Sequence, residues 1–156
     1  MDSSISQLIL TPIDQPELIT AAIQDISLQG ILNQTKAGYV YLKVDDRFIH
    51  TLFPLLQTTQ KKLPPYFEKP YNIGAHISVI YKEEIKNLQP IAEIGSTFHF
   101  NILELCEIKM NEKIFFALII EAHELITIRK KYGFSEKPVY HGIPVDYHIT
   151  IAMGGV

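Results

Sequence analysis

Residues 75–81 read Ala-His-Ile-Ser-Val-Ile-Tyr, and residues 147–153 read Tyr-His-Ile-Thr-Ile-Ala-Met. Both stretches are rich in β-branched and aromatic residues, which is typical of β-strands. Side chains two positions apart on a strand point to the same face, while the residue between them points to the other face. The sequence therefore predicts two strands that each present an imidazole beside a hydroxyl, one a His-x-Ser pair and the other a His-x-Thr pair.

The two predicted strands close two segments of similar organisation. In the first segment, a strand over residues 39–44 precedes a helix and a proline-bearing loop over residues 61–74. In the second segment, an apolar strand over residues 113–121 precedes a helix over residues 122–132 and a proline-bearing loop over residues 134–146. The matched order of elements predicts two quasi-equivalent lobes that face each other across a central cleft.

The N-terminal part of the chain does not belong to this repeated order. Residues 1–37 are predicted to form a helical extension packed on the core of the main domain, which we place at residues 38–156. Asp14 is the expected cap of that helix, and Gly30 is its expected stop. In the helix of the first segment, Pro54 interrupts the apolar pattern, which predicts a kink or a later start.

The composition restricts both the substrate and the location. A net charge of −3 disfavours a protein that grips many phosphates of a long nucleic acid, because such proteins need a basic surface. The longest uncharged apolar run, residues 114–120, is too short to cross a membrane, and the first residues lack a secretory pattern. Cys106 is the only cysteine, so an internal disulfide is excluded. We expect a cytoplasmic protein that binds neither membranes nor an obligate protein partner.

The paired motifs fit the chemistry of displacement at phosphorus. That reaction needs a base beside the nucleophile, an acid beside the leaving group and donors to the non-bridging oxygens. Two histidines with ordinary pKa values near 6.5 would exist in both protonation states around neutrality. The motifs carry no carboxylate or cysteine at zinc spacing, and no glycine-rich phosphate loop precedes a helix. We therefore expect neither a metal nor a cofactor.

The two motifs and their surroundings resemble the two-histidine (2H) phosphoesterase superfamily, over about residues 39–156. That superfamily includes RNA 2′,3′-cyclic phosphodiesterases, 2′-5′ RNA ligase-like proteins and 2′,5′-oligoadenylate phosphodiesterases. The resemblance implies an α+β fold, with two lobes of antiparallel sheet, helices outside and the active site in the cleft. It also implies that His76 and His148 are the catalytic acid–base pair. Ser78 and Thr150 would bind the phosphate, with Ser78 replacing the commoner threonine.

Four further residues could contact the substrate. Tyr71 and Tyr140 lie in the loops before the two motifs and could stack on a base. His141 follows Tyr140 and could overhang the cleft. Lys82 follows the first motif strand and could add positive charge near the phosphate. For both His141 and Lys82, the alternative is a solvent-exposed side chain that does not contact the substrate.

Three functions fit these observations. The first is a hydrolase that acts on an RNA 2′,3′-cyclic phosphate or a 2′-5′ linkage. The second is a phosphodiesterase of a cyclic or oligomeric nucleotide signal, and the third is a module that binds a nucleotide or RNA end without turnover. The presence of all four motif residues favours an enzyme, but the sequence does not separate the first function from the second.

Overall fold

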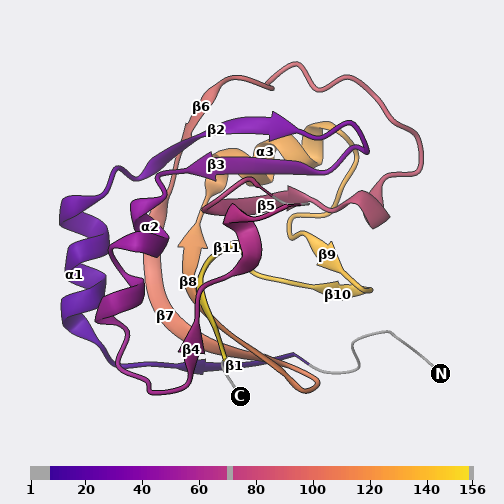
Figure 1. Ribbon diagram of the computed structural model, residues 1–156. Helices are drawn as coiled ribbons and strands as arrows, with labels where there is room; N and C mark the ends of the chain where they lie inside the picture. Colours follow the sequence, from indigo (N-terminus) through magenta and orange to yellow (C-terminus); the bar gives the residue numbers. More distant parts are fainter. Residues whose placement is uncertain (1–7, 70–71, 155–156) are drawn as a thin grey trace.

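The computed structural model describes residues 8–69 and 72–154, and Figure 1 shows the order of its elements. The α-helices and 3₁₀ helices are α1 (Pro16–Asp25), α2 (Arg47–His50), η1 (Phe53–Leu55), η2 (Pro65–Phe67), η3 (Lys82–Glu84) and α3 (His123–Lys131). The strands are β1 (Leu8–Pro12), β2 (Gln29–Gln34), β3 (Val40–Val44), β4 (Lys61–Lys62), β5 (His76–Ile80), β6 (Thr97–His99), β7 (Asn101–Met110), β8 (Lys113–Glu121), β9 (Val139–Tyr140), β10 (Ile143–Pro144) and β11 (His148–Gly154).

Nine strands of the described residues form one sheet in the order β1-β7-β8-β11-β5-β3-β2-β6, with β4 added to the end of β11. Each neighbouring pair is antiparallel, so the α+β class with antiparallel sheet is confirmed. The sheet bends strongly: in Figure 1, β2 and β3 run across the view whereas β7 and β8 run down it. The strands of the two motifs, β5 and β11, are direct neighbours with Ile77 opposite Ile149. The sequence predicted two lobes of sheet, but the structure has one continuous sheet, because the motif strands β5 and β11 pair with each other in its middle.

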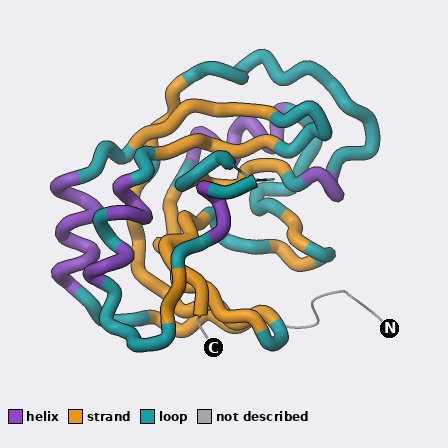
Figure 2. The backbone as a smooth tube through the Cα atoms, in the orientation of Figure 1, coloured by secondary structure: helices purple, strands orange, loops and turns teal. Residues whose placement is uncertain are grey.

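The main hydrophobic core lies on the face of the sheet that holds Ile77 and Ile149. All three α-helices contribute to this core, and Figure 2 shows them outside the layer of strands. Their buried residues are Leu18 and Ala22 in α1, Phe48 and Ile49 in α2, and Leu125 and Ile128 in α3. Alternation along β5 and β11 then turns the histidines and hydroxyls of the two motifs to the opposite face, which we call the motif face. Within the described residues, no helix is long and apolar enough to cross a membrane.

The N-terminal segment contributes two strands that the sequence did not predict. The predicted helix is present as α1, but it ends at Asp25 and the following residue is already extended. The prediction that Gly30 ends this helix is wrong. Gly30 lies in β2, which pairs with β3 and β6. A side chain at Gly30 would collide with the carbonyl oxygen of Lys43 and the side chain of Leu42. Glycine is thus required here by the close approach of a neighbouring strand.

The helix predicted between the strand over 39–44 and the first motif strand is interrupted near Pro54, as expected from the sequence. Helix α2 ends at His50, and Pro54 lies in the first turn of the separate 3₁₀ helix η1. Proline cannot donate a backbone hydrogen bond, so the continuous helix breaks there. The loop before the second motif contains the short β9–β10 hairpin, in which Ile143 is opposite Tyr140.

Candidate active site

The start of strand β5 is fixed by the carboxylate of Asp46. Its Oδ1 accepts hydrogen bonds from the backbone N–H of Ala75 at 3.0 Å and from Nζ of Lys43 at 2.6 Å. Gly74 precedes this point with a φ of 68°, and a Cβ there would collide with the Asp46 carboxylate. Only glycine satisfies both conditions, so the sequence Gly-Ala-His fixes the entry of His76 into the strand.

The two motif histidines are oriented in the same way, each by the carbonyl two residues before it. Nδ1 of His76 donates to the Gly74 carbonyl oxygen at 2.7 Å, and Nδ1 of His148 donates to the Asp146 carbonyl oxygen at 2.8 Å. A carbonyl oxygen only accepts hydrogen bonds, so the proton of each neutral imidazole resides on Nδ1. Nε2 is then the nitrogen available for proton transfer on both rings.

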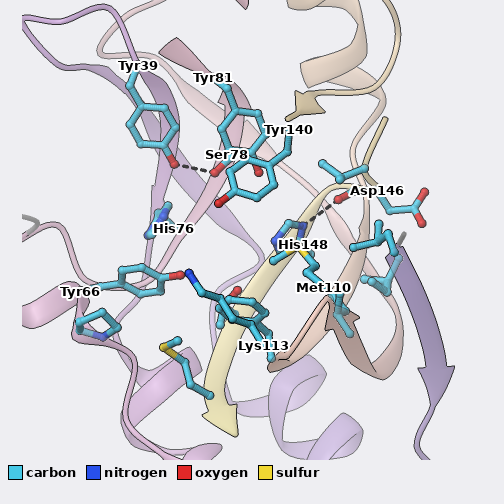
Figure 3. A pocket seen from close by; sticks show the side chains of 18 of the residues that line it. Tyr39, Tyr66, His76, Ser78, Tyr81, Met110, Lys113, Tyr140, Asp146 and His148 are labelled. Atoms are coloured by element: carbon cyan, nitrogen blue, oxygen red, sulfur yellow. Dashed lines mark hydrogen bonds between the residues drawn. The ribbon is translucent and has the colours of Figure 1, made fainter. Parts of the chain in front are cut away.

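A cavity of about 470 Å³ opens on the motif face and is lined by all four motif residues, His76, Ser78, His148 and Thr150. Figure 3 shows the two imidazoles on either side of this space, with the Asp146 carbonyl bonded to His148. The volume falls in the range of sites for small molecules. The two strands thus place two imidazoles and two hydroxyls around one pocket.

Tyrosines surround the first motif, and the sequence prediction missed three of them. The hydroxyl of Tyr39 is 2.5 Å from Oγ of Ser78, and the Tyr66 ring meets the His76 ring edge-on at 4.6 Å between centroids. Burial raises the pKa of the Tyr39 and Tyr81 hydroxyls above their ordinary value, so both remain protonated donors. The alternation Tyr39-Val-Tyr41 was the sequence signal that could have indicated these tyrosines. Tyr41 lies opposite Ser78, so Tyr39, two residues earlier, is directed to the same side of the sheet.

Burial changes the protonation of both motif histidines from that predicted. Loss of solvent lowers the pKa of His76 to about 4, against the opposing effect of the Gly74 hydrogen bond, and the neighbouring His148 lowers it further. Burial also lowers the pKa of His148, while the Asp146 carbonyl and carboxylate oppose this. Both imidazoles are therefore neutral at pH 7, whereas the sequence predicted that neutral and protonated forms coexist around neutrality. A bound phosphate favours the imidazolium form through its negative charge.

A family model described as the Swiss Army Knife 2H phosphoesterase domain matches residues 40–154. The chain belongs to this family. The match includes both motif strands, and it confirms the resemblance to the 2H phosphoesterase superfamily and a phosphoesterase activity in general. No curated protein and no solved structure gives a significant match.

The other residues predicted to contact substrate lie in different places in this 2H phosphoesterase. Tyr140 lines the cavity, from the β9–β10 hairpin. His141 is exposed in that hairpin, where its backbone N–H donates to Glu83, and Lys82 is exposed in η3; neither lines the cavity. Tyr71 lies outside the described residues. Lys113, at the start of β8, lines the cavity, although nothing in the sequence pattern singled it out.

The 2H phosphoesterase site also contains one carboxylate near the second motif. The Asp146 carboxylate points away from the His148 ring in Figure 3, and it pairs with Nζ of Lys137 at 2.9 Å. Among residues 8–69 and 72–154, no three side chains of His, Cys, Asp or Glu are grouped so that they could hold a metal ion. The groups around the cavity are suited to proton transfer and hydrogen bonding.

Proposed function

We propose that this 2H phosphoesterase is a metal-independent phosphodiesterase that hydrolyses a ribose-linked phosphodiester, either an RNA 2′,3′-cyclic phosphate or a 2′-5′ linkage. The observation that carries the proposal is the matched orientation of His76 and His148, each with Nδ1 engaged and Nε2 available, in one cavity with two hydroxyls. The cavity volume of about 470 Å³ and the net charge of −3 favour a small substrate over a long polymer.

The reaction divides the work between the two histidines. His76, whose pKa is lowered to about 4, acts as the base and takes a proton from water as the water oxygen bonds to phosphorus. The bond from phosphorus to the ribose oxygen breaks, and protonated His148 gives its proton to that oxygen. The hydroxyls of Ser78 and Thr150 donate to the non-bridging oxygens. Tyr39 directs the Ser78 hydroxyl through their hydrogen bond.

We further propose that the site joins two quasi-equivalent halves of the sheet. The strand order supports this, because it is matched outward from the two motif strands. Strand β11 is followed by β8 and then β7, while β5 is followed by β3 and then β2. Each half places a helix between its first strand and its motif strand, α2 in one and α3 in the other.

We expect the pH profile of kcat/KM to be a bell with its maximum on the acid side of pH 6.5. Burial lowers the pKa of both histidines, and the reaction needs one imidazole neutral and the other protonated. The rate then falls below about pH 4, where His76 is protonated, and it falls as pH rises through the lowered pKa of His148. Because bound phosphate favours imidazolium, the profile of kcat should lie at higher pH than that of kcat/KM. A maximum of kcat/KM above pH 8 would contradict this prediction.

We expect activity to survive treatment with a chelator, because the acid, the base and the phosphate donors are all side chains. The measurement compares initial rates of the purified protein before and after dialysis against EDTA. Rates within about twofold of each other are the expected result, since proton transfer by side chains does not require a Lewis acid. Loss of activity that zinc or manganese restores would overturn the metal-independent mechanism.

The proposed function is tested by a substrate screen with identified products. The substrates are 2′,3′-cyclic mononucleotides, 2′-5′ and 3′-5′ dinucleotides, and cyclic dinucleotides. Turnover of the first or second class supports the proposal, and turnover of cyclic dinucleotides alone would replace it with a role in nucleotide signalling. Tight binding without turnover of any class would instead support a non-catalytic module.

A further inference from the structure

The cavity has two chemically different sides. Around the first motif, hydroxyl-bearing side chains of Tyr39, Tyr66 and Tyr81 line it. Beyond the second motif, six side chains form what we call the apolar wall: Leu8, Leu10, Ile108, Met110, Phe115 and Ile119. Figure 3 shows this division, with Tyr39 and His76 on one side of the space and His148 and Met110 on the other.

The register of the sheet makes the apolar wall a continuation of the motif face. Residues directly opposite each other in antiparallel strands share a face. Ile119 lies opposite His148, and a second row runs from Met153 through Phe115 and Ile108 to Leu10. That row crosses three strand spacings, or about 14 Å at about 4.8 Å each. The apolar surface therefore begins beside the catalytic imidazole and extends to the edge strand β1.

Small residues between these rows give the wall depth. Thr150 lies opposite Ala117, and Ala117 lies opposite Cys106. Cys106, Ile108, Ala117 and Ile119 form a hydrophobic cluster separate from the main core, with Leu8, Leu10, Met110 and Phe115 packed around it. Ile108 and Ile119 of this cluster line the cavity together with the four residues packed around it, whereas the core on the other face is covered by the helices. An apolar surface of this kind is typical of a ligand site.

The chemistry of the wall favours a hydrocarbon over a nucleobase. None of its six side chains contains nitrogen or oxygen, and the backbone groups of β7 and β8 pair with each other along most of their length. The amine of Lys113, which lies opposite Met110 and also lines the cavity, is a polar group at the far end of the wall from His148. The donors and acceptors on the edge of a nucleobase would lose water there without gaining partners, at a cost of about 1–3 kcal/mol for each group. A hydrocarbon loses no hydrogen bond when it enters.

We propose that the apolar wall is the subsite for a hydrocarbon group esterified to the substrate phosphate, so that the substrate is a mixed diester of ribose and an apolar alcohol. This inference rests on the proposed function for the cleavage step, at the bond between phosphorus and a ribose oxygen. It differs from the proposed function in the second ester, which is to an apolar alcohol in place of a second ribose or the second oxygen of a cyclic phosphate. Water adds to phosphorus, the bond to the ribose oxygen breaks, and that oxygen receives the proton of His148. The products are the free ribose hydroxyl and an alkyl phosphate monoester, whose hydrocarbon stays on the apolar wall.

The product monoester provides a direct binding test with the full chain. The affinities of hexyl phosphate and methyl phosphate are measured by titration calorimetry for the wild type and for Leu10→Asn. We expect hexyl phosphate to bind more tightly by about fourfold for each buried methylene, which corresponds to about 0.8 kcal/mol. Leu10→Asn should reduce that preference about tenfold. Leu103→Asn is the matched control, because Leu103 is exposed on β7 and does not line the cavity.

Equal affinity for the two monoesters, or an equal loss in both variants, would overturn the apolar subsite. Tighter binding of a 2′-5′ dinucleotide than of hexyl phosphate, with the same sensitivity to Leu10→Asn, would overturn it in favour of a nucleobase. Turnover is measured separately, on the methyl and hexyl diesters of adenosine 2′-phosphate. Hexyl phosphate bound without turnover of these diesters or of any substrate in the screen would refute the proposed function and leave the subsite standing. Equal turnover of the methyl and hexyl diesters would support the proposed function and refute the apolar subsite.

Discussion

Replacement of either His76 or His148 by alanine is expected to lower kcat by about 10²–10⁴-fold, the usual contribution of a positioned proton-transfer group. Each imidazole presents Nε2 to the cavity because its Nδ1 is bonded to a backbone carbonyl. No other described histidine lines the cavity, so neither role has a substitute among the described residues. The measurement is single-turnover kinetics on the substrate that the screen identifies, with folding checked by circular dichroism.

The double variant provides the sharper test of this pair. Since neither histidine alone completes the reaction, losing both should cost little more than losing one, far less than the product of the single losses. His99→Ala and His123→Ala are matched controls, because both side chains are exposed and outside the cavity. A folded His76→Ala or His148→Ala protein with nearly wild-type rates would sink the catalytic assignment.

Replacement of Arg129 by methionine is expected to lower the free energy of unfolding by about 3–5 kcal/mol, the usual cost of breaking a buried ion pair. Arg129 is fully buried in α3, and its guanidinium donates to both carboxylate oxygens of Glu84 at 2.7 and 2.9 Å. It also donates to the carbonyl oxygens of Val79, at the end of β5, and Ser135. Methionine leaves the Glu84 carboxylate buried and uncompensated. The melting temperature should fall by about 10 °C for a chain of this size.

Two further variants separate the buried pair from a general effect of removing an arginine. Arg47→Met removes the other arginine, whose pair with Asp45 is exposed, and should leave the melting temperature nearly unchanged. Arg129→Met combined with Glu84→Met should recover much of the lost stability, because no charge is then buried alone. Equal melting temperatures for Arg129→Met and Arg47→Met would contradict the prediction.

The sequence predicted those parts of the fold whose local pattern and final environment agree. The strands over 39–44, 75–81, 113–121 and 147–153 are present within one residue at either end, because their apolar and β-branched residues pack against the core. Strand β2 was missed because its sequence, Gln-Gly-Ile-Leu-Asn-Gln, contains a glycine and three amides, and its strand conformation depends on pairing with β3 and β6. Glycine is required at position 30 by the close approach of β3, which cannot be predicted from the local sequence.

The candidate site divides in the same way. Strand alternation is local, and it was sufficient to pair His76 with Ser78 and His148 with Thr150 on one face. The lowered pKa values and the hydrogen bond between Tyr39 and Ser78 depend on which strands become neighbours, and so on tertiary structure. The apolar wall belongs to the same category, because Leu10, Ile108 and Phe115 are ordinary strand residues until the register brings them into one row.

The hydrogen bonds that orient the two imidazoles have a consequence for how the protein tolerates mutation. Each imidazole ring is oriented by the carbonyl two residues earlier, that of Gly74 for His76 and that of Asp146 for His148. The orientation of each ring thus depends directly on a three-residue stretch of its own backbone. The backbone at His76 is held in turn by the Asp46 carboxylate, so Asp46 is a distant side chain on which the orientation of that ring depends. The Ser78 hydroxyl is different, because it is hydrogen-bonded to the side chain of Tyr39, just before β3. In the proposed mechanism, substitutions at Tyr39 or in the walls of the pocket therefore change the substrate preference while both imidazoles keep their backbone hydrogen bonds.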